Sequence, residues 1–225
     1  MFLALARSRR ASRGRICEQL RISGSGAMAN GYFRQTCTRA RGFLGAAADG
    51  SPRVLRDRET YYLNPDVGLD WATFQELAGK GQARGRDGVE KLRAALDLVR
   101  GEPLQDCPYE WIDQAMVTYM RSRIVEVAEC LSARAEDPVV AGWAACRGLL
   151  ADPYAEQLYR ALMRSAHVAG HTRALFGAYE LCMEALSGLG LKPDEQTTGL
   201  LYDLTGSRSV PRSFRRCIGG RGSGA

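Results

Sequence analysis

A helical periodicity that begins near residue 70 limits what this chain can fold into. Apolar residues recur three or four positions apart in two successive stretches: Trp71, Phe74, Leu77 and Ala78, then Val89, Leu92, Leu96 and Val99. Such spacing places the side chains on one face of a helix. A glycine-rich, charged connection separates the two stretches. They predict a pair of short antiparallel helices, the repeating unit of scaffolds that bind partners.

The periodicity continues to about residue 205. A longer stripe predicts a helix over residues 109–135, with Ile112, Met116, Met120, Ile124, Val127 and Leu131 on one face. Asp137-Pro138 and Asp152-Pro153 each predict a helix start, because Asp caps a helix and Pro suits its first position. Glycines predict the ends of the following helices. In total we expect seven helices after residue 70, mostly in hairpin pairs.

The two ends of the chain lack this pattern. Residues 1–38 show no sustained period and are predicted to be a basic, disordered segment, as is the Arg-, Gly- and Ser-rich tail, residues 206–225. Between them, Leu44-Gly45 predicts a helix end, and Val54-Leu55 and Tyr61–Leu63 predict a hairpin. The expected fold class is therefore mainly α, with antiparallel helical hairpins preceded by a short β-hairpin.

Charge is distributed unevenly along the chain. Residues 1–60 carry 12 Arg against 4 acidic residues, residues 61–205 carry 14 basic against 21 acidic residues, and residues 206–225 add 5 Arg. The helical region is thus acidic, at −7, which makes nucleic acid a poor ligand for it and favours a protein partner or self-association. Arginine outnumbers lysine 28 to 3 along the whole chain, a usage typical of GC-rich genomes, so a single Arg is weak evidence of function.

No constellation of residues points to catalysis, a cofactor or a metal. His167 and His171 have a zinc-compatible spacing, but Gly170 interrupts the helix between them and no third ligand accompanies them. We interpret this segment as a turn between helices. The seven cysteines are scattered without a CxxC pair, which favours reduced thiols in the cytoplasm. No apolar run approaches the about 20 residues that a membrane helix needs.

Two groups of residues carry a family resemblance over residues 61–205. The first is Asp70, Phe74, Ala95-Leu96, Leu98, Arg100-Gly101 and Pro103-Leu104. The second is Asp152-Pro153, Glu156, Leu162-Met163, Gly170, Ala174-Leu175, Tyr179, Leu189-Gly190 and Pro193. In order and spacing they resemble the bacterial transcriptional activator domain of SARP-type regulators of actinobacteria, a tetratricopeptide-like helical module. The resemblance implies such a domain over residues 64–205.

In that family a winged-helix DNA-binding domain precedes the helical module. The end of such a domain resembles Arg39, Arg41, Leu44-Gly45, Asp49-Gly50 and Tyr61–Leu63. The resemblance implies a winged-helix remnant over residues 39–63, with Arg34, Arg39 and Arg41 as candidate DNA contacts. Upstream of it the resemblance stops, so we expect an incomplete winged helix, and a truncated or frameshifted start.

Two functional hypotheses follow from these patterns. The first is the helical module of a SARP-like transcriptional regulator, which acts through protein contacts or dimerisation and leaves any DNA contact to the basic N-terminal part. The second is an interaction scaffold, or a fragment of a larger signalling protein, without DNA binding. No arrangement of residues favours an enzyme.

Overall fold

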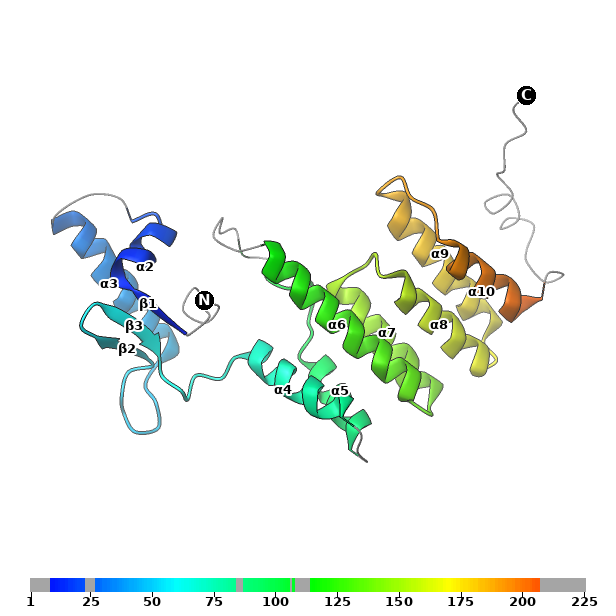
Figure 1. The fold of residues 1–225 in the computed structure, drawn as a ribbon, viewed down its shortest axis with the longest axis horizontal. Helices are drawn as coiled ribbons and strands as arrows, with labels where there is room; N and C mark the ends of the chain where they lie inside the picture. The colour runs from blue at the N-terminus through cyan, green and yellow to red at the C-terminus, as the bar shows by residue number, and fades with distance from the viewer. Residues whose placement is uncertain (1–8, 23–26, 84–86, 106, 108–113, 207–225) are drawn as a thin grey trace, which may run out of the picture. The chain divides into compact units, whose positions relative to one another are not determined.

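The computed structural model describes residues 9–22, 27–83, 87–105, 107 and 114–206, which form nine helices and three strands (Figure 1). The chain divides into two compact units, residues 1–73 and 74–225. The first contains β1 (Arg10–Ser12), α2 (Arg13–Gln19), α3 (Ala27–Leu44), β2 (Val54–Asp57) and β3 (Thr60–Leu63). The boundary falls within α4 (Asp70–Gln82).

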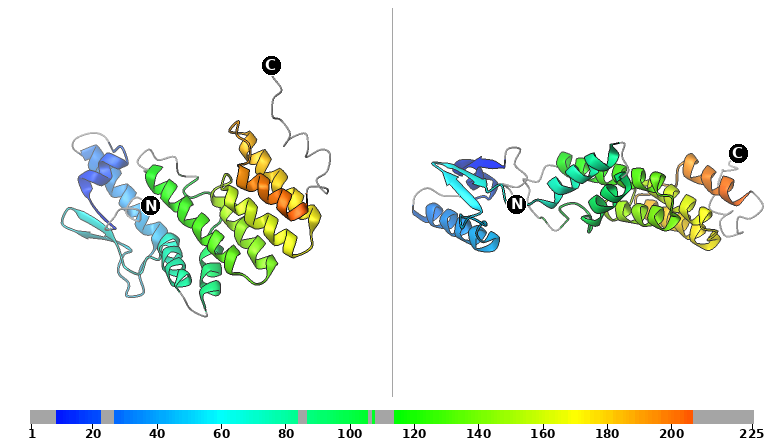
Figure 2. Two further views of the ribbon diagram at one scale, coloured as in Figure 1. Left: turned by 45° about the vertical axis from the view of Figure 1, so that its right-hand side comes forward. Right: turned by 90° about the horizontal axis from the view of Figure 1, so that it is seen from below.

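The second unit continues with helices only: α5 (Gly88–Asp97), α6 (Gln114–Arg134), α7 (Pro138–Ala151), α8 (Glu156–Val168), α9 (Thr172–Ser187) and α10 (Glu195–Thr205). The mainly helical fold class is confirmed, as are the seven helices expected after residue 70. The two views in Figure 2 show the helices of this unit following one another in chain order, with α6 against α7 and α8 against α9.

A small antiparallel sheet organises the first unit. Its strand order is β1-β3-β2, so the predicted hairpin of β2 and β3 is confirmed and gains a third strand. Phe33 of α3 packs edge-on against Tyr61 of β3, with ring centroids 5.1 Å apart. The other buried side chains of this core are Ala11, Ile16, Val54 and Leu63.

The expectation of disorder over residues 1–38 is wrong wherever the structure describes them, because β1, α2 and most of α3 lie there. The sequence pattern that could have predicted α3 is weak. It consists of four residues at helical spacing that pack on the core: Phe33, Cys37, Ala40 and Leu44. Strand β1 has three residues and forms through pairing with β3, which is distant in sequence. Residues 1–8 and 23–26 lie outside the described residues, as does the predicted tail from residue 207 onward.

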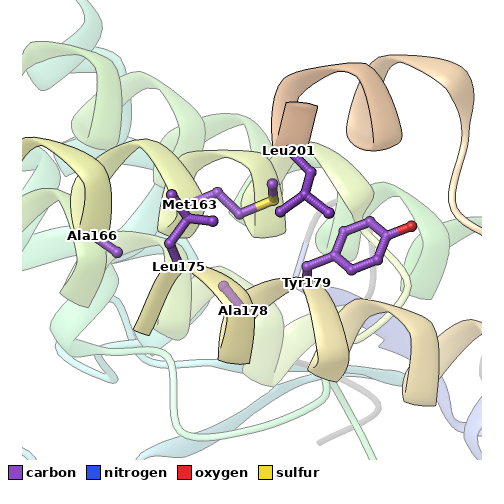
Figure 3. Packing of buried hydrophobic residues seen from close by; sticks show 6 residues of the cluster. All are labelled: Met163, Ala166, Leu175, Ala178, Tyr179 and Leu201. Atoms are coloured by element: carbon purple, nitrogen blue, oxygen red, sulfur yellow. The ribbon is translucent and has the colours of Figure 1, made fainter. Parts of the chain in front are cut away.

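Buried side chains from three helices form the core at the end of the second unit. Met163 and Ala166 come from α8, Leu175, Ala178 and Tyr179 from α9, and Leu201 from α10 (Figure 3). Small residues allow the neighbouring helices to approach closely, and Ala144, Ala145 and Gly148 of α7 are fully or almost fully buried. Within the described residues, no helix is both long and apolar enough to cross a membrane.

The two predicted Asp-Pro helix starts have different outcomes. Asp137 caps α7 as expected, because its carboxylate accepts a hydrogen bond from Val139 N at 2.8 Å and Pro138 is the first helical residue. The prediction for Asp152 is wrong. Asp152 ends α7, its carbonyl accepts from Ala155 N, and α8 begins only at Glu156. A turn therefore separates α7 from α8.

Asp194 caps α10 and joins it to α8. Its carboxylate accepts from Thr197 N at 2.6 Å and lies 3.1 Å from the Arg160 guanidinium. Partial burial alone would raise the pKa of Asp194, but the hydrogen bonds from Thr197 and the charge of Arg160 outweigh it, so this pKa lies below its ordinary value. The charged form is thus the one that the fold stabilises.

We expect Asp194→Asn to lower the stability of the protein at neutral pH and to have no effect at acidic pH. Asn also caps helices, so the substitution removes mainly the charge. A lowered pKa in the folded state gives stability that is present above about pH 4 and is lost as the pH falls through that pKa. The effect at pH 7 is roughly 0.5 kcal/mol, because solvent screens a carboxylate that is 45% exposed. Thermal unfolding between pH 7 and pH 3 measures it, with Asp203→Asn as the control.

Candidate functional site

Helix α3 presents a basic, acid-free surface in the first unit. Its 18 residues include three Arg and no Asp or Glu. The inner face is set by Phe33, which is buried against the sheet, and by Cys37, which packs on the same core. Gly45 ends the helix with a φ of +71°, as its predicted role as a left-handed cap requires. The opposite face of the helix is exposed.

Arg34 and Arg39 both lie on the exposed part of α3. They are five residues apart, which corresponds to about 140° around a helix. Each therefore occupies a different edge of the exposed face, where the guanidinium groups can reach two different phosphates or base edges. This arrangement suits a helix that lies in a groove of a nucleic acid duplex.

Arg41, the third sequence-predicted contact, is used inside the unit. Its Nε donates a hydrogen bond to Val54 O at 3.0 Å and so ties α3 to β2. Its side chain is only partly exposed. Arg34 and Arg39 therefore lie at different edges of the exposed face of α3, whereas Arg41 makes a structural contact.

Arg41→Ala is expected to destabilise the first unit by about 1 kcal/mol, because it leaves the carbonyl of Val54 without this donor. Arg39→Ala on the same helix is the matched control, and a surface substitution of this kind changes stability by less than about 0.5 kcal/mol. Thermal unfolding of both variants measures the difference. Equal stability of the two variants would contradict the structural role of Arg41.

Most other arginines of the first unit also contact the protein itself. Arg9 donates to Val67 O at 2.7 Å, Arg53 donates to Leu44 O at 2.8 Å, and the Arg13 guanidinium lies 5.2 Å from the centre of the Phe33 ring. The high arginine content of this region is therefore in part a structural feature. Counting arginines in the sequence overstates the surface available for nucleic acid.

Among the exposed arginines that the sequence analysis did not select are Arg15 and Arg58. Arg15 lies in the first turn of α2, and Arg58 lies in the turn between β2 and β3 with a φ of +52°. The predicted hairpin could have indicated Arg58, since the turn residues of a hairpin point away from the sheet. Arg15 gave no such signal, because α2 itself was not predicted.

Two thiols, one on α3 and one on α9, lie in surroundings that disfavour the charged thiolate. Burial raises the pKa of Cys182 to about 12 and also raises the pKa of the partly buried Cys37, so these two groups are held as neutral thiols. His167 lies in the last turn of α8 and His171 precedes α9, both exposed. Among the described residues no three potential metal ligands are grouped together.

A groove in the second unit is the other candidate interface. It has a volume of about 380 Å³ and lies between the C-terminal half of α6, the start of α7 and one side of α8. Small and apolar residues form much of it, and the charged residues Glu129, Glu136 and Arg164 belong to its lining. The sequence analysis did not predict this groove, because its lining residues come from three helices and share no motif. Its composition suits a protein segment better than a nucleic acid.

Comparison with known families adds the decisive observation for the second unit. The bacterial transcriptional activator domain matches residues 69–204. The chain belongs to this family. The bacterial transcriptional activator domain thus spans α4 to α10 almost completely, and it includes the groove between α6 and α8. The basic helix α3 lies outside it. A search of curated proteins finds no match for the chain.

Proposed function

We propose that this chain is a SARP-like regulator of transcription in which the helical unit makes protein contacts and the first unit contacts DNA. The observation that carries the proposal is the combination of an activator-family domain with a separately packed unit whose arginine-bearing helix has no acidic residue. Such a regulator acts in the cytoplasm, where its scattered cysteines stay reduced.

The net charges of the two units support the assignment of DNA contact to one unit and protein contact to the other. Residues 1–73 carry 12 Arg and 6 acidic residues, a net charge of +6, whereas residues 74–205 carry 14 basic and 19 acidic residues, a net charge of −5. DNA attracts basic surfaces through its phosphates and repels acidic ones. DNA contact is therefore assigned to the first unit, and dimerisation or contact with the transcription machinery to the second.

The local order of the first unit supports the DNA assignment. An arginine-bearing helix ends at Leu44-Gly45, a turn follows at Asp49-Gly50, and the hairpin of β2 and β3 ends at Leu63. This is the order expected from the resemblance to the end of a winged helix. In helix-turn-helix proteins, a helix in the major groove reads base edges while neighbouring groups contact phosphates. We assign those roles to α3 and to the turn that carries Arg58.

The double variant Arg34→Ala/Arg39→Ala is expected to weaken DNA binding by the full-length chain. Removal of one phosphate-binding arginine should lower the slope of log affinity against log salt by about 0.9, so the double variant should reduce that slope by about 2. Fluorescence anisotropy with a labelled duplex at two or more salt concentrations measures both the affinity and the slope. The duplexes are the DNA upstream of the gene and a scrambled sequence of equal length.

Arg100→Ala/Arg173→Ala is the matched control, because it removes the same charge from exposed positions of the second unit. This variant should bind DNA like the parent chain. Equal reductions in affinity for the two double variants would show that net charge alone matters. A parent chain that does not bind either duplex at low salt would instead favour the alternative function, an interaction scaffold without DNA binding.

A further inference from the structure

The groove between α6 and α8 presents a small-residue surface with charged groups beside it. Four alanines line it, one from each of the three helices and one just after the end of α6: Ala133, Ala135, Ala141 and Ala161. The two hydroxyls of the lining are already used, since Ser132 donates to Ala141 O at 2.9 Å and Ser165 donates to Pro138 O at 2.6 Å. The four alanines are the floor of the groove. This floor suits apolar side chains, so polar recognition depends on the charged residues beside it.

Acidic residues dominate one side of the groove. Glu129 of α6 and Glu136, just beyond its end, are both exposed, and Arg164 of α8 is the basic residue among the lining side chains. Asp137 adds a further exposed carboxylate next to Glu136. A segment that carries several arginines together with apolar residues would match this surface in charge and in polarity.

The chain itself contains such a segment directly after α10. Residues 207–225 include five Arg and no acidic residue. They also include three apolar residues at intervals of four: Val210, Phe214 and Ile218. Because these residues combine arginines with apolar side chains, they fit the floor and the acidic side of the groove at once.

The point from which this segment leaves the helical unit is the end of α10, a helix that packs beside α8. Asp194, before α10, contacts Arg160 of α8, and Leu201 of α10 packs in one cluster with Met163 and Ala166 of α8 (Figure 3). The two helices therefore run side by side in the same direction. Gly206 follows Leu201 by five residues, about 8 Å along a helix. It caps α10 at the end that corresponds in direction to the C-terminal end of α8, where Val168 lines the groove.

We propose that the groove between α6 and α8 is the docking site of the chain's own arginine-rich segment, residues 207–225. Arginines of the segment pair with Glu129 and Glu136, and its apolar residues cover the alanine floor. Nineteen residues of chain can span about 60 Å, so reach does not limit the contact. A docked segment occupies the groove, and a protein partner that uses the same surface has to displace it.

Proteolysis of the full-length chain tests the proposal. Trypsin cleaves after the arginines of residues 207–225, and docking should slow this cleavage relative to a free peptide of the same sequence. Glu129→Gln/Glu136→Gln should speed the cleavage by about five-fold, the change expected when two exposed ion pairs are removed. Added salt should have a similar effect on the parent chain. Glu180→Gln/Glu184→Gln, at exposed positions of α9, is the matched control and should cleave like the parent.

A second measurement separates docking from an indirect effect of the substitutions. A full-length variant with R208S, R212S, R215S, R216S and R221S should bind a labelled peptide of residues 207–225, and the same variant with E129Q and E136Q should bind it about five-fold more weakly. Equal cleavage rates in all chains, or a peptide that does not bind, would overturn the proposal. Protection that rises with protein concentration would also overturn it, since the segment of a second copy would then occupy the groove.

Discussion

Leu158→Ala is expected to lower the free energy of unfolding of the helical unit by about 2–5 kcal/mol, the range for a fully buried leucine whose truncation leaves a cavity. Leu158 is 0% exposed. Its side chain lies against Gly148 of α7, and Ala128 of α6 lies beside the same glycine. Three helices meet at this point, so the surrounding backbone has little freedom to collapse into the space.

Urea unfolding of the full-length chain, followed by far-ultraviolet circular dichroism, measures this decrease in stability. Leu181→Ala is the control, because Leu181 is 55% exposed on α9 and its truncation should change stability by less than about 0.5 kcal/mol. Similar midpoints for the two variants would show that Leu158 does not fill the junction of the three helices.

Gly148→Ala is expected to destabilise the helical unit by about 1–3 kcal/mol, the usual cost of overpacking a core. A Cβ atom at this position would lie 2.5 Å from Leu158 Cδ1 and 2.7 Å from Ala128 Cβ, both closer than side chains tolerate. The leucine methyl can move, but the Cβ atom of Ala128 is fixed to the backbone of α6. The clash therefore forces α6 and α7 apart, and this outweighs the gain in helix propensity of about 1 kcal/mol.

Gly177→Ala is the matched control for this substitution. Gly177 lies inside α9 and has no atom within 4 Å of the position of an added Cβ. The same chemical change should therefore stabilise the protein by about 0.5–1 kcal/mol. Denaturant unfolding of both variants measures the two effects, and stabilisation by Gly148→Ala would contradict the close helix crossing.

The double variant Gly148→Ala/Leu158→Ala separates the two clashes at residue 148. Removing the leucine methyls relieves the clash at 2.5 Å but leaves the clash with Ala128 Cβ at 2.7 Å. The double variant should consequently be less destabilised than the sum of the single variants, without matching Leu158→Ala. Additive effects would indicate that Leu158 already moves aside in Gly148→Ala.

The sequence predicted the second unit more fully than the first. Phe74, Leu92, Leu131 and Leu175 belong to apolar stripes at helical spacing, and all four are buried. In these helices the pattern repeats over three or more turns, so it stands out from the surrounding polar residues. The first unit has short elements, and its α3 buries one residue, Phe33, as fully as a core helix does. A helix with so few buried residues is hard to recognise in a largely polar sequence.

The candidate site residues were predictable to different degrees. Arg34 and Arg39 were named as candidates from the sequence because they lie near the part that resembles the DNA-facing end of a winged helix. The hydrogen bond of Arg41 to Val54 O joins two residues that are 13 positions apart in the sequence, so no local sequence pattern predicts it. The groove likewise depends on how α6, α7 and α8 pack, because its lining residues come from separate helices.

The sequence by itself determined the helical character of residues 70–205, the family to which they belong and the opposite charges of the two parts of the chain. These properties depend on spacing, composition and local caps, which operate over a few neighbouring residues. The tertiary structure alone decided the fold of the N-terminal part, where β1 needs β3 as its partner. It also decided which arginines stay exposed and where a groove forms, because contacts between residues distant in sequence determine both.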